Sequence, residues 1–208
     1  MEYQIIRKKI KNVYIHVKDG VVFISAPYRL SETQIQKLVT QKKGWIEKQF
    51  RKQESENKQV KNEFILLGKS YPINTLASNS EYIEFTGSNV NIYLNDNADD
   101  KISKLINQLY RKCAQKQYII TTQKMMGLTG LRPNSWRIRD IKSAWGSCSS
   151  KRNITLSLNL VTKREEVIEY VVLHELCHLK HMNHSKDFWN LVGKYMPDYK
   201  VYRKELKV

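Results

Sequence analysis

The chain carries the pattern H-E-x-x-H at residues 174–178, and a further histidine follows at position 184. On an α-helix, residues four apart lie on the same face, so His174 and His178 can offer their imidazoles to one metal ion. Zinc binds neutral histidine nitrogens in a tetrahedron, with one open corner when the site is catalytic. Glu175 lies beside this face, where a carboxylate can hold the water that the metal binds. The pattern therefore predicts metal-assisted hydrolysis with Glu175 as general base.

Two histidines compete for the place of the third ligand. On a straight helix, His181 lies about 10.5 Å along the axis from His174, which is too far for one small ion to bridge. His184 follows Asn183, and asparagine is common in the left-handed turn that ends a helix. A chain that turns back there can bring His184 to the metal, so we expect His184, with His181 as the alternative. A carboxylate ligand is a weaker option, because Glu205 is the only glutamate after the motif.

A structural alternative for this stretch is a core helix whose histidines only make hydrogen bonds. Four of the chain's five histidines, however, fall between residues 174 and 184. Burying several imidazoles beside a carboxylate is costly unless they bind a metal or are fully paired. Zinc binding is therefore the better interpretation of the cluster.

Several runs around the motif and further toward the N-terminus give a family resemblance. They are Trp145-Gly146-Ser147-Cys148-Ser149-Ser150, Tyr170 to His178, Asn183-His184-Ser185, Phe188-Trp189, Lys43-Gly44-Trp45-Ile46 and Leu67-Gly68-Lys69-Ser70-Tyr71-Pro72. Over nearly its whole length the chain resembles the YgjP-like metallopeptidases, which are bacterial and archaeal zincins related to the SprT and WLM types. The resemblance implies zinc on His174, His178 and His184, with Glu175 as the catalytic base. Ala144 departs from the family pattern, in which an arginine often precedes the Trp-Gly-Ser-Cys run.

The function expected from these residues is zinc-dependent hydrolysis of peptide bonds. Two alternatives are a metal-dependent nucleotide pyrophosphatase of the UTP type, a label attached to part of this family, and a DNA-associated protease of the SprT type. The first is disfavoured because the sequence has no glycine-rich phosphate loop and no acidic cluster for magnesium. Three downstream tyrosines, Tyr195, Tyr199 and Tyr202, are candidates to stabilise the oxyanion.

Composition limits the partners and the compartment. The formal net charge of +16 favours anionic partners, so nucleic acid could contact the basic surface, although a lysine-rich surface that only keeps the protein in solution is the alternative. The three cysteines are an odd number without paired spacing, which argues against a disulfide framework and fits a reducing cytoplasm. The sequence has no apolar run long enough to span a membrane and no apolar segment of signal-peptide length at its start.

The elements that position these residues predict an α+β fold in two parts. Residues 1–95 are expected to form a β-rich subdomain with one helix and antiparallel strands, and residues 96–208 a zincin-like domain with a sheet and the H-E-x-x-H helix. In the first part, strands 13–17 and 21–25 form a hairpin around Asp19-Gly20. Ser31 then caps a helix, with Gln34 completing a capping box. The polar stretch 53–62 is a plausible boundary of its own.

The expected strands after that stretch cover residues 64–67, 71–76, 82–85 and 90–94 and form a small antiparallel sheet. A long helix follows from about 99 to 126, with Gly127 just past its end. Strands 136–141 and 154–160 precede the motif helix, which Thr162 should cap, and Ser185 should cap a last helix.

Overall fold

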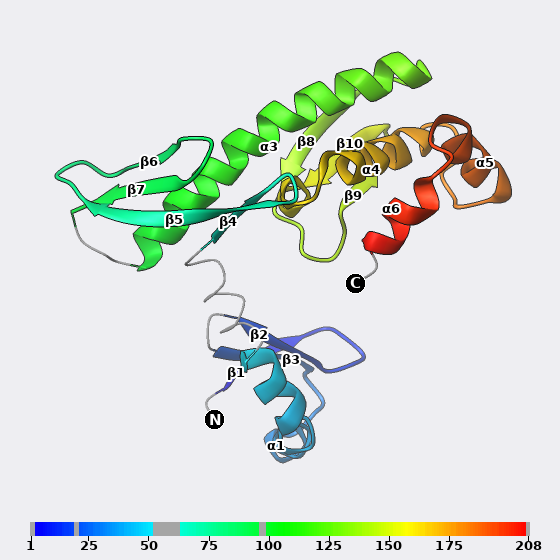
Figure 1. The fold of residues 1–208 in the computed structure, drawn as a ribbon. Coiled ribbons are helices and arrows are strands. Elements are labelled where there is room, and N and C mark those ends of the chain that lie inside the picture. The colour runs from blue at the N-terminus through cyan, green and yellow to red at the C-terminus, as the bar shows by residue number, and fades with distance from the viewer. Residues whose placement is uncertain (1–2, 19–20, 52–62, 96–98, 207–208) are drawn as a thin grey trace. The chain divides into compact units, whose positions relative to one another are not determined.

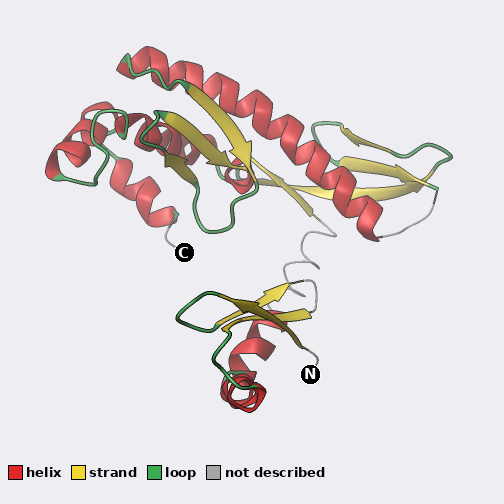
Figure 2. Ribbon diagram, turned by 180° about the vertical axis from the view of Figure 1, so that it is seen from behind, coloured by secondary structure: helices red, strands yellow, loops and turns green. Residues whose placement is uncertain are grey.

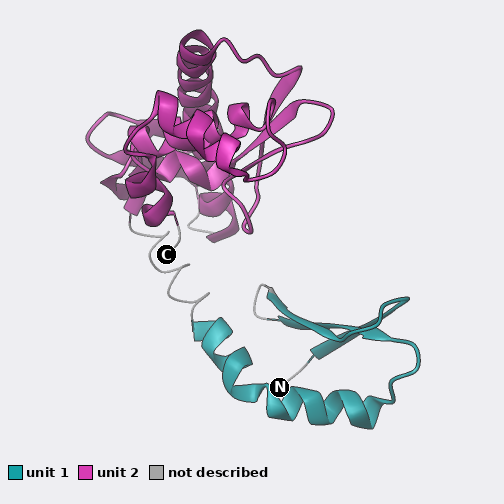
Figure 3. Ribbon diagram, turned by 90° about the vertical axis from the view of Figure 1, so that its right-hand side faces the viewer, with its two compact units in different colours: residues 1–62 teal, residues 63–208 magenta. Residues whose placement is uncertain are grey.

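The computed structural model describes residues 3–18, 21–51, 63–95 and 99–206, and it divides the chain into two compact units, Met1–Asn62 and Glu63–Val208 (Figure 3). The sequence predicts a boundary at 95/96 instead. Strands between residues 63 and 95 belong with the second unit, because their buried side chains share one core with the helices that follow. The polar stretch 53–62 lies outside the described residues. The mixed α+β class is confirmed.

The first unit contains a three-stranded sheet in the order β1-β3-β2 (Figure 1). Strands β2 (Tyr14–Lys18) and β3 (Val21–Pro27) pair in antiparallel fashion, which confirms the expected hairpin strands, while the turn residues 19–20 lie outside the described residues. Strand β1 (Tyr3–Lys8), which the sequence pattern did not indicate, pairs in parallel with β3. The two strands of this parallel pair are far apart in the sequence, so no local sequence pattern predicts their pairing.

Helix α1 (Glu32–Gln41) begins with the expected capping box. The Ser31 hydroxyl accepts a hydrogen bond from the Gln34 backbone N–H, and the Gln34 side chain accepts one from the Ser31 N–H, so two donors at the helix start are satisfied. Residues 43–51 are helical again after a turn at Lys42. A separate apolar core holds this unit together, and it includes Val22, Ile24, Ile35 and Ile46.

The second unit begins with a four-stranded sheet in the order β4-β5-β7-β6. Its strands are β4 (Glu63–Leu66), β5 (Lys69–Ala77), β6 (Tyr82–Phe85) and β7 (Val90–Leu94). The expectation of an antiparallel sheet is wrong for one pair, because β5 and β7 run in parallel. Strand β6 lies between β5 and β7 in the sequence, but in the sheet it pairs with the edge of β7 that faces away from β5. The other edge of β7 pairs with β5.

Helix α3 (Asp99–Thr129) runs past both sheets of this unit, at the back in Figure 1 and at the front in Figure 2. One stripe of its side chains is buried, including Ile106, Leu109 and Met125, as expected for an amphipathic helix. The helix runs past Gly127 and ends before Gly130, whose φ of 70° is the left-handed conformation that glycine adopts at low cost. No helix in the described part of the chain combines the length and the apolar character needed to cross a membrane.

The second sheet of this unit has the order β8-β10-β9. Strand β10 (Asn153–Ser157) pairs in parallel with β8 (Ser135–Arg139) and in antiparallel fashion with β9 (Gly146–Cys148). Strand β9 is therefore an edge of the sheet. The expected strand 154–160 is shorter than predicted, because Leu158–Thr162 forms a 3-10 helix, η1.

Helices α4 (Glu165–Cys177), α5 (Lys186–Tyr195) and α6 (Tyr199–Glu205) complete the unit. Thr162 does not cap α4: its hydroxyl donates to the Asn159 carbonyl within η1, and the cap position is Arg164, without a side-chain bond. Ser185 does cap α5, because its hydroxyl accepts from the Phe188 N–H.

Helix α4 is buried on most of its surface, between α3 on one side and β9 and β10 on the other. Its buried apolar and aromatic side chains are Val167, Ile168, Tyr170, Val171, Val172, Leu173, Leu176 and Cys177. A helix that is apolar nearly all round belongs in the interior. The polar residues in its last turn are therefore carried into the interior of the unit.

Candidate metal centre

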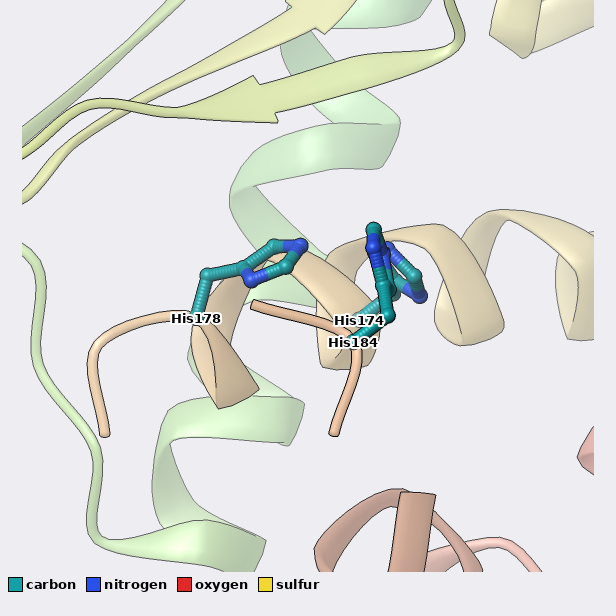
Figure 4. Close-up of side chains that lie close together, drawn as sticks. All are labelled: His174, His178 and His184. Atoms are coloured by element: carbon teal, nitrogen blue, oxygen red, sulfur yellow. The ribbon is translucent and has the colours of Figure 1, made fainter. Parts of the chain in front are cut away.

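Three histidines converge at the C-terminal end of α4 (Figure 4). His174 lies in the last turn of the helix, and His178 is the residue at its end. His184 comes from the turn between α4 and α5, one residue before the Ser185 cap. The cap fixes the start of α5 and so fixes where the chain turns back. The structure thus brings together the three histidines that the sequence singled out.

The ligand nitrogens of these three histidines all lie within 4.8 Å of one another. The Nε2 atoms of His174 and His184 are 2.9 Å apart. Two nitrogens bound to one tetrahedral zinc ion lie about 3.3 Å apart, since each is ~2.0–2.1 Å from the metal. The rings are therefore spaced almost as a shared ion requires. Phe188 of α5 packs against all three, with ring centroids 4.5–4.8 Å away.

His178 is oriented by a backbone contact. Its Nδ1 lies 3.0 Å from the carbonyl oxygen of His181. A carbonyl oxygen only accepts, so Nδ1 carries the proton and the lone pair of the neutral ring is on Nε2, available to a metal. His181 thus contributes its backbone, and its side chain is not part of the three-histidine group. Glu205, the weaker alternative ligand, pairs with Arg164 instead.

The surroundings keep two of the imidazoles neutral. Burial, with smaller contributions from His178, His184 and Arg203, lowers the pKa of His174 to about 3. Burial also lowers the pKa of His178. Neutral imidazole is the form that binds metal, so these two rings need to lose no proton before they coordinate an ion at neutral pH.

Glu175 is buried against strand β9, with 5% of its surface exposed. A Cβ atom on Gly146 would lie 2.8 Å from the Glu175 Oε1 and 2.9 Å from its Cγ, so only glycine leaves room for this side chain. Burial raises the pKa of Glu175 to about 8. The carboxyl group is therefore held in place by packing, and burial brings its pKa near neutral pH.

These residues fit a metal ion by two observations besides their spacing. Glu175 Oε2 is buried beside them without a hydrogen-bond partner among the described residues. Buried polar atoms are nearly always paired, so this oxygen indicates a missing partner at the site. The donor set is three imidazole nitrogens, which suits zinc and related transition metals and not magnesium or calcium, whose ligands are oxygens.

Two pockets flank the histidines, and Gly146, His174 and Glu175 line both of them. The α6-side pocket, of about 250 Å³, is completed by Trp145, Tyr170, Val171, Arg203 and Leu206. The β9-side pocket, of about 280 Å³, is completed by Ser147, Cys148, His178, Met182 and His184. The two pockets, which share Gly146, His174 and Glu175, are together called the recess.

The pockets change the set of candidate residues. Tyr195, Tyr199 and Tyr202 line neither pocket, whereas Tyr170, one turn before His174, lines the α6-side pocket. Burial raises the pKa of Tyr170 to about 12, so its hydroxyl keeps its proton and can donate a hydrogen bond. The spacing of four residues to His174 was a signal for Tyr170 that sequence reasoning missed. Arg203 had no such signal, because it reaches the site from a separate helix.

Comparison with known proteins gives the family of the chain. The family model of the YgjP-like metallopeptidase domain matches residues 11–208. The chain therefore belongs to the YgjP-like metallopeptidases, which makes it a metal-dependent hydrolase of peptide bonds. One solved structure, the metallopeptidase zymogen of Pyrococcus abyssi abylysin, shares 28% identity over 41% of this chain and 88% of that chain, with a TM-score of 0.38. No curated protein gives a significant match.

Proposed function

We propose that the protein is a zinc metallopeptidase of zincin type, in which His174, His178 and His184 bind zinc and Glu175 is the general base. The observation that carries the proposal is the convergence of three imidazoles beside a buried carboxyl oxygen that has no partner among the described residues. The match to a metallopeptidase family supports the reaction class. The catalytic part lies within Glu63–Val208, the unit that contains every proposed site residue.

Zinc bound there would lower the pKa of a water molecule and polarise the peptide carbonyl. Glu175 accepts the proton from the attacking water and passes it to the leaving amine. A base with a pKa near the working pH can do both, and burial moves Glu175 in that direction. Tyr170 lies in the α6-side pocket with a protonated hydroxyl, where it can donate to the oxygen that becomes negative in the transition state.

Strand β9 supplies the surface on which the substrate lies. It is an edge of the sheet β8-β10-β9, and its residues Gly146, Ser147 and Cys148 line the recess. An extended peptide can add to such an edge by backbone hydrogen bonds, which holds its carbonyls along the site without regard to side chains. This arrangement supports hydrolysis within a peptide chain.

Two further expectations belong to this proposal. The three free cysteines fit a reducing compartment, and we propose a cytoplasmic location on that ground. None of the comparisons supports a nucleic-acid partner, so peptide is the substrate that we propose.

The test is metal removal followed by selective return. Protein treated with a chelator should lose hydrolysis of unfolded protein and peptide substrates, and stoichiometric zinc should restore it. Magnesium should not restore it, because the donor set consists of three imidazole nitrogens and magnesium takes oxygen ligands. Full activity in the metal-free protein would contradict the proposal, as would restoration by magnesium alone.

A further inference from the structure

Arg203 of helix α6 is the cation that lines the recess: it borders the α6-side pocket, and the β9-side pocket has no lysine or arginine among its described lining residues. Its guanidinium carbon lies 4.3 Å from the centroid of the Trp189 ring. Stacking on the ring face holds the flat group while leaving its edge, which carries the N–H donors, open to other groups.

Other contacts fix the helix that carries Arg203. The Arg164 side chain forms an ion pair with Glu205 at 3.0 Å, and the Trp145 indole N–H donates to the Leu206 carbonyl at 3.2 Å. The first contact ties the end of α6 to the start of α4, and the second ties the following residue to Trp145 in the wall of the pocket. The position of Arg203 at the pocket is therefore built by its neighbours and does not depend on an ion pair of its own.

Within the described residues the Arg203 side chain has no ion pair and no hydrogen bond, whereas Arg164 contacts both Glu166 and Glu205. Glu175 is the acidic residue that lines the same pocket, but it does not serve as the partner. Arg203 is thus a positive charge with open donors beside the reaction centre.

The rest of the pocket is mostly apolar. Trp145, Val171 and Leu206 form its walls, and Tyr170 adds one hydroxyl. A planar guanidinium against an apolar wall matches a carboxylate, which can accept two parallel N–H bonds from it. A basic side chain has no acceptor for these bonds, and an amide side chain has one acceptor oxygen and no negative charge.

We propose that the α6-side pocket is a subsite for a carboxylate of the peptide substrate next to the bond that is cut, and that Arg203 recognises it. The inference rests on the proposed peptidase function and adds a substrate class to it. A carboxylate at this place can come from an aspartate or glutamate side chain or from the C-terminus of the peptide. The first source makes the enzyme selective for acidic sequences, and the second makes it remove residues from a C-terminus.

The test uses blocked octapeptides that carry Glu, Gln or Lys at one position scanned along the chain, each made with a free C-terminal acid and as the amide. The zinc-loaded full-length protein is compared with Arg203→Met, which keeps an unbranched stem against Trp189, and with Arg203→Glu, which reverses the charge. The matched control is Lys204→Met, because Lys204 is the next residue of α6, is exposed, and does not line the pocket. Zinc content is measured for every variant.

The wild type should cut peptides with a carboxylate at one position about tenfold faster in kcat/KM than their neutral counterparts, the scale of a charge-assisted pair. Arg203→Met should abolish that preference, Arg203→Glu should favour Lys, and Lys204→Met should behave as the wild type. A preference that follows Glu against Gln assigns the side chain, and one that follows acid against amide assigns the C-terminus. The proposal is overturned if the wild type shows neither preference, or if Arg203→Met keeps it.

A binding measurement separates failure of this inference from failure of the peptidase function. Dye-labelled versions of the same peptides are titrated with zinc-loaded Glu175→Gln protein and with the Glu175→Gln, Arg203→Met double variant, and binding is followed by anisotropy. Tighter binding of the carboxylate peptides that disappears in the double variant supports the subsite even if no peptide is cut, in which case the peptidase proposal alone fails. Equal binding of acidic and neutral peptides to the single variant overturns the subsite.

Discussion

Helices α3 and α4 pack against each other, and both bury polar side-chain atoms without a partner among the described residues, one atom on α3 and two on α4. On α3 it is one hydroxyl, that of Thr122, on a helix whose buried stripe is otherwise largely apolar. On α4 the unpaired atoms belong to His174 and Glu175, which lie at two pockets together with further histidines. An isolated buried hydroxyl such as that of Thr122 is a small cost of packing and needs no ligand. Several unpaired polar side chains that meet at one place indicate a binding site.

The largest expected effect comes from Glu175→Gln on α4. Glutamine fits the same space but cannot take a proton, so hydrolysis should fall about 10²–10⁴-fold, the usual contribution of a general base. Zinc content should stay at the wild-type level, because the three imidazoles are untouched. Peptide turnover and metal analysis on one preparation check both results. Turnover within about twofold of the wild type would remove Glu175 from the mechanism.

His184→Ala tests the ligand that lies outside α4. Loss of one of three imidazoles should weaken zinc binding by more than the roughly 10–100-fold that loss of a group supporting a ligand costs. His181→Ala is the matched control, since His181 contributes only its carbonyl oxygen to the site and should retain zinc affinity. Titration against a chelating dye measures both. A larger loss of zinc affinity in His181→Ala than in His184→Ala would identify His181 as the third ligand.

Gly146→Ala tests the packing that holds Glu175. The added methyl group would lie 2.8 Å from the Glu175 Oε1, so the carboxyl group must move. Hydrolysis should fall by about tenfold or more, because a misplaced base transfers protons poorly, while zinc stays bound. Alanine at the neighbouring position, Ser147→Ala, is the control that leaves this contact intact. An unchanged kcat in Gly146→Ala would show that the position of the carboxyl group is not critical.

Stability of the metal-free protein should depend on pH through Glu175. Its pKa is raised to about 8 by burial, so the folded state holds this proton where the unfolded chain, with a pKa near 4.5, does not. The contribution of Glu175 to the free energy of unfolding is therefore fully present below pH 4.5 and is lost as pH rises toward 8. Glu175→Gln should accordingly be more stable than the wild type at pH 8 by over about 1 kcal/mol, since one pKa unit corresponds to roughly 1.4 kcal/mol.

At pH 4.5 the advantage of Glu175→Gln should shrink. Urea unfolding of both metal-free proteins at the two pH values measures the difference. A difference that is the same at pH 4.5 and pH 8 would mean that Glu175 is not held in its protonated form.

The smallest expected effect is that of Thr122→Val on α3. Valine has nearly the same shape, and it removes a buried hydroxyl that the described residues leave unpaired. The free energy of unfolding should rise by about 0.5–1 kcal/mol, independently of pH, with zinc binding and hydrolysis unchanged. Loss of activity in this variant would show that the unpaired hydroxyl on α3 contributes to the site, as the polar groups of α4 do.

The residues of the metal site could be predicted from sequence because their relation is local. The helix period places His174, Glu175 and His178. The left-handed turn expected at Asn183 is wrong: among the described non-glycine residues only Leu67 and Arg152 have a positive φ, and the helix already ends at Cys177, so His184 returns through a bend of ordinary backbone. The contact of Gly146 with Glu175 could not be predicted, because it joins an edge strand to a helix across the core. The place of Arg203 at the pocket could not be predicted either, because it depends on how the separate helix α6 packs.

The fold shows the same division between local and long-range signals. The caps Ser31 and Ser185 were predicted correctly, since a cap bonds to residues two or three positions away. The Thr162 cap was wrong because the 3-10 helix η1 uses that hydroxyl. Parallel pairing of β5 with β7 depends on a return through β6, and alternation within a strand does not reveal its partner.

The most direct measurement is anomalous X-ray diffraction at the zinc edge from crystals of the zinc-loaded protein. One strong peak should lie ~2.0–2.1 Å from a nitrogen of each of His174, His178 and His184, with the Glu175 carboxyl group alongside. A peak coordinated by other side chains, or these imidazoles turned away from the ion, would contradict the proposed site.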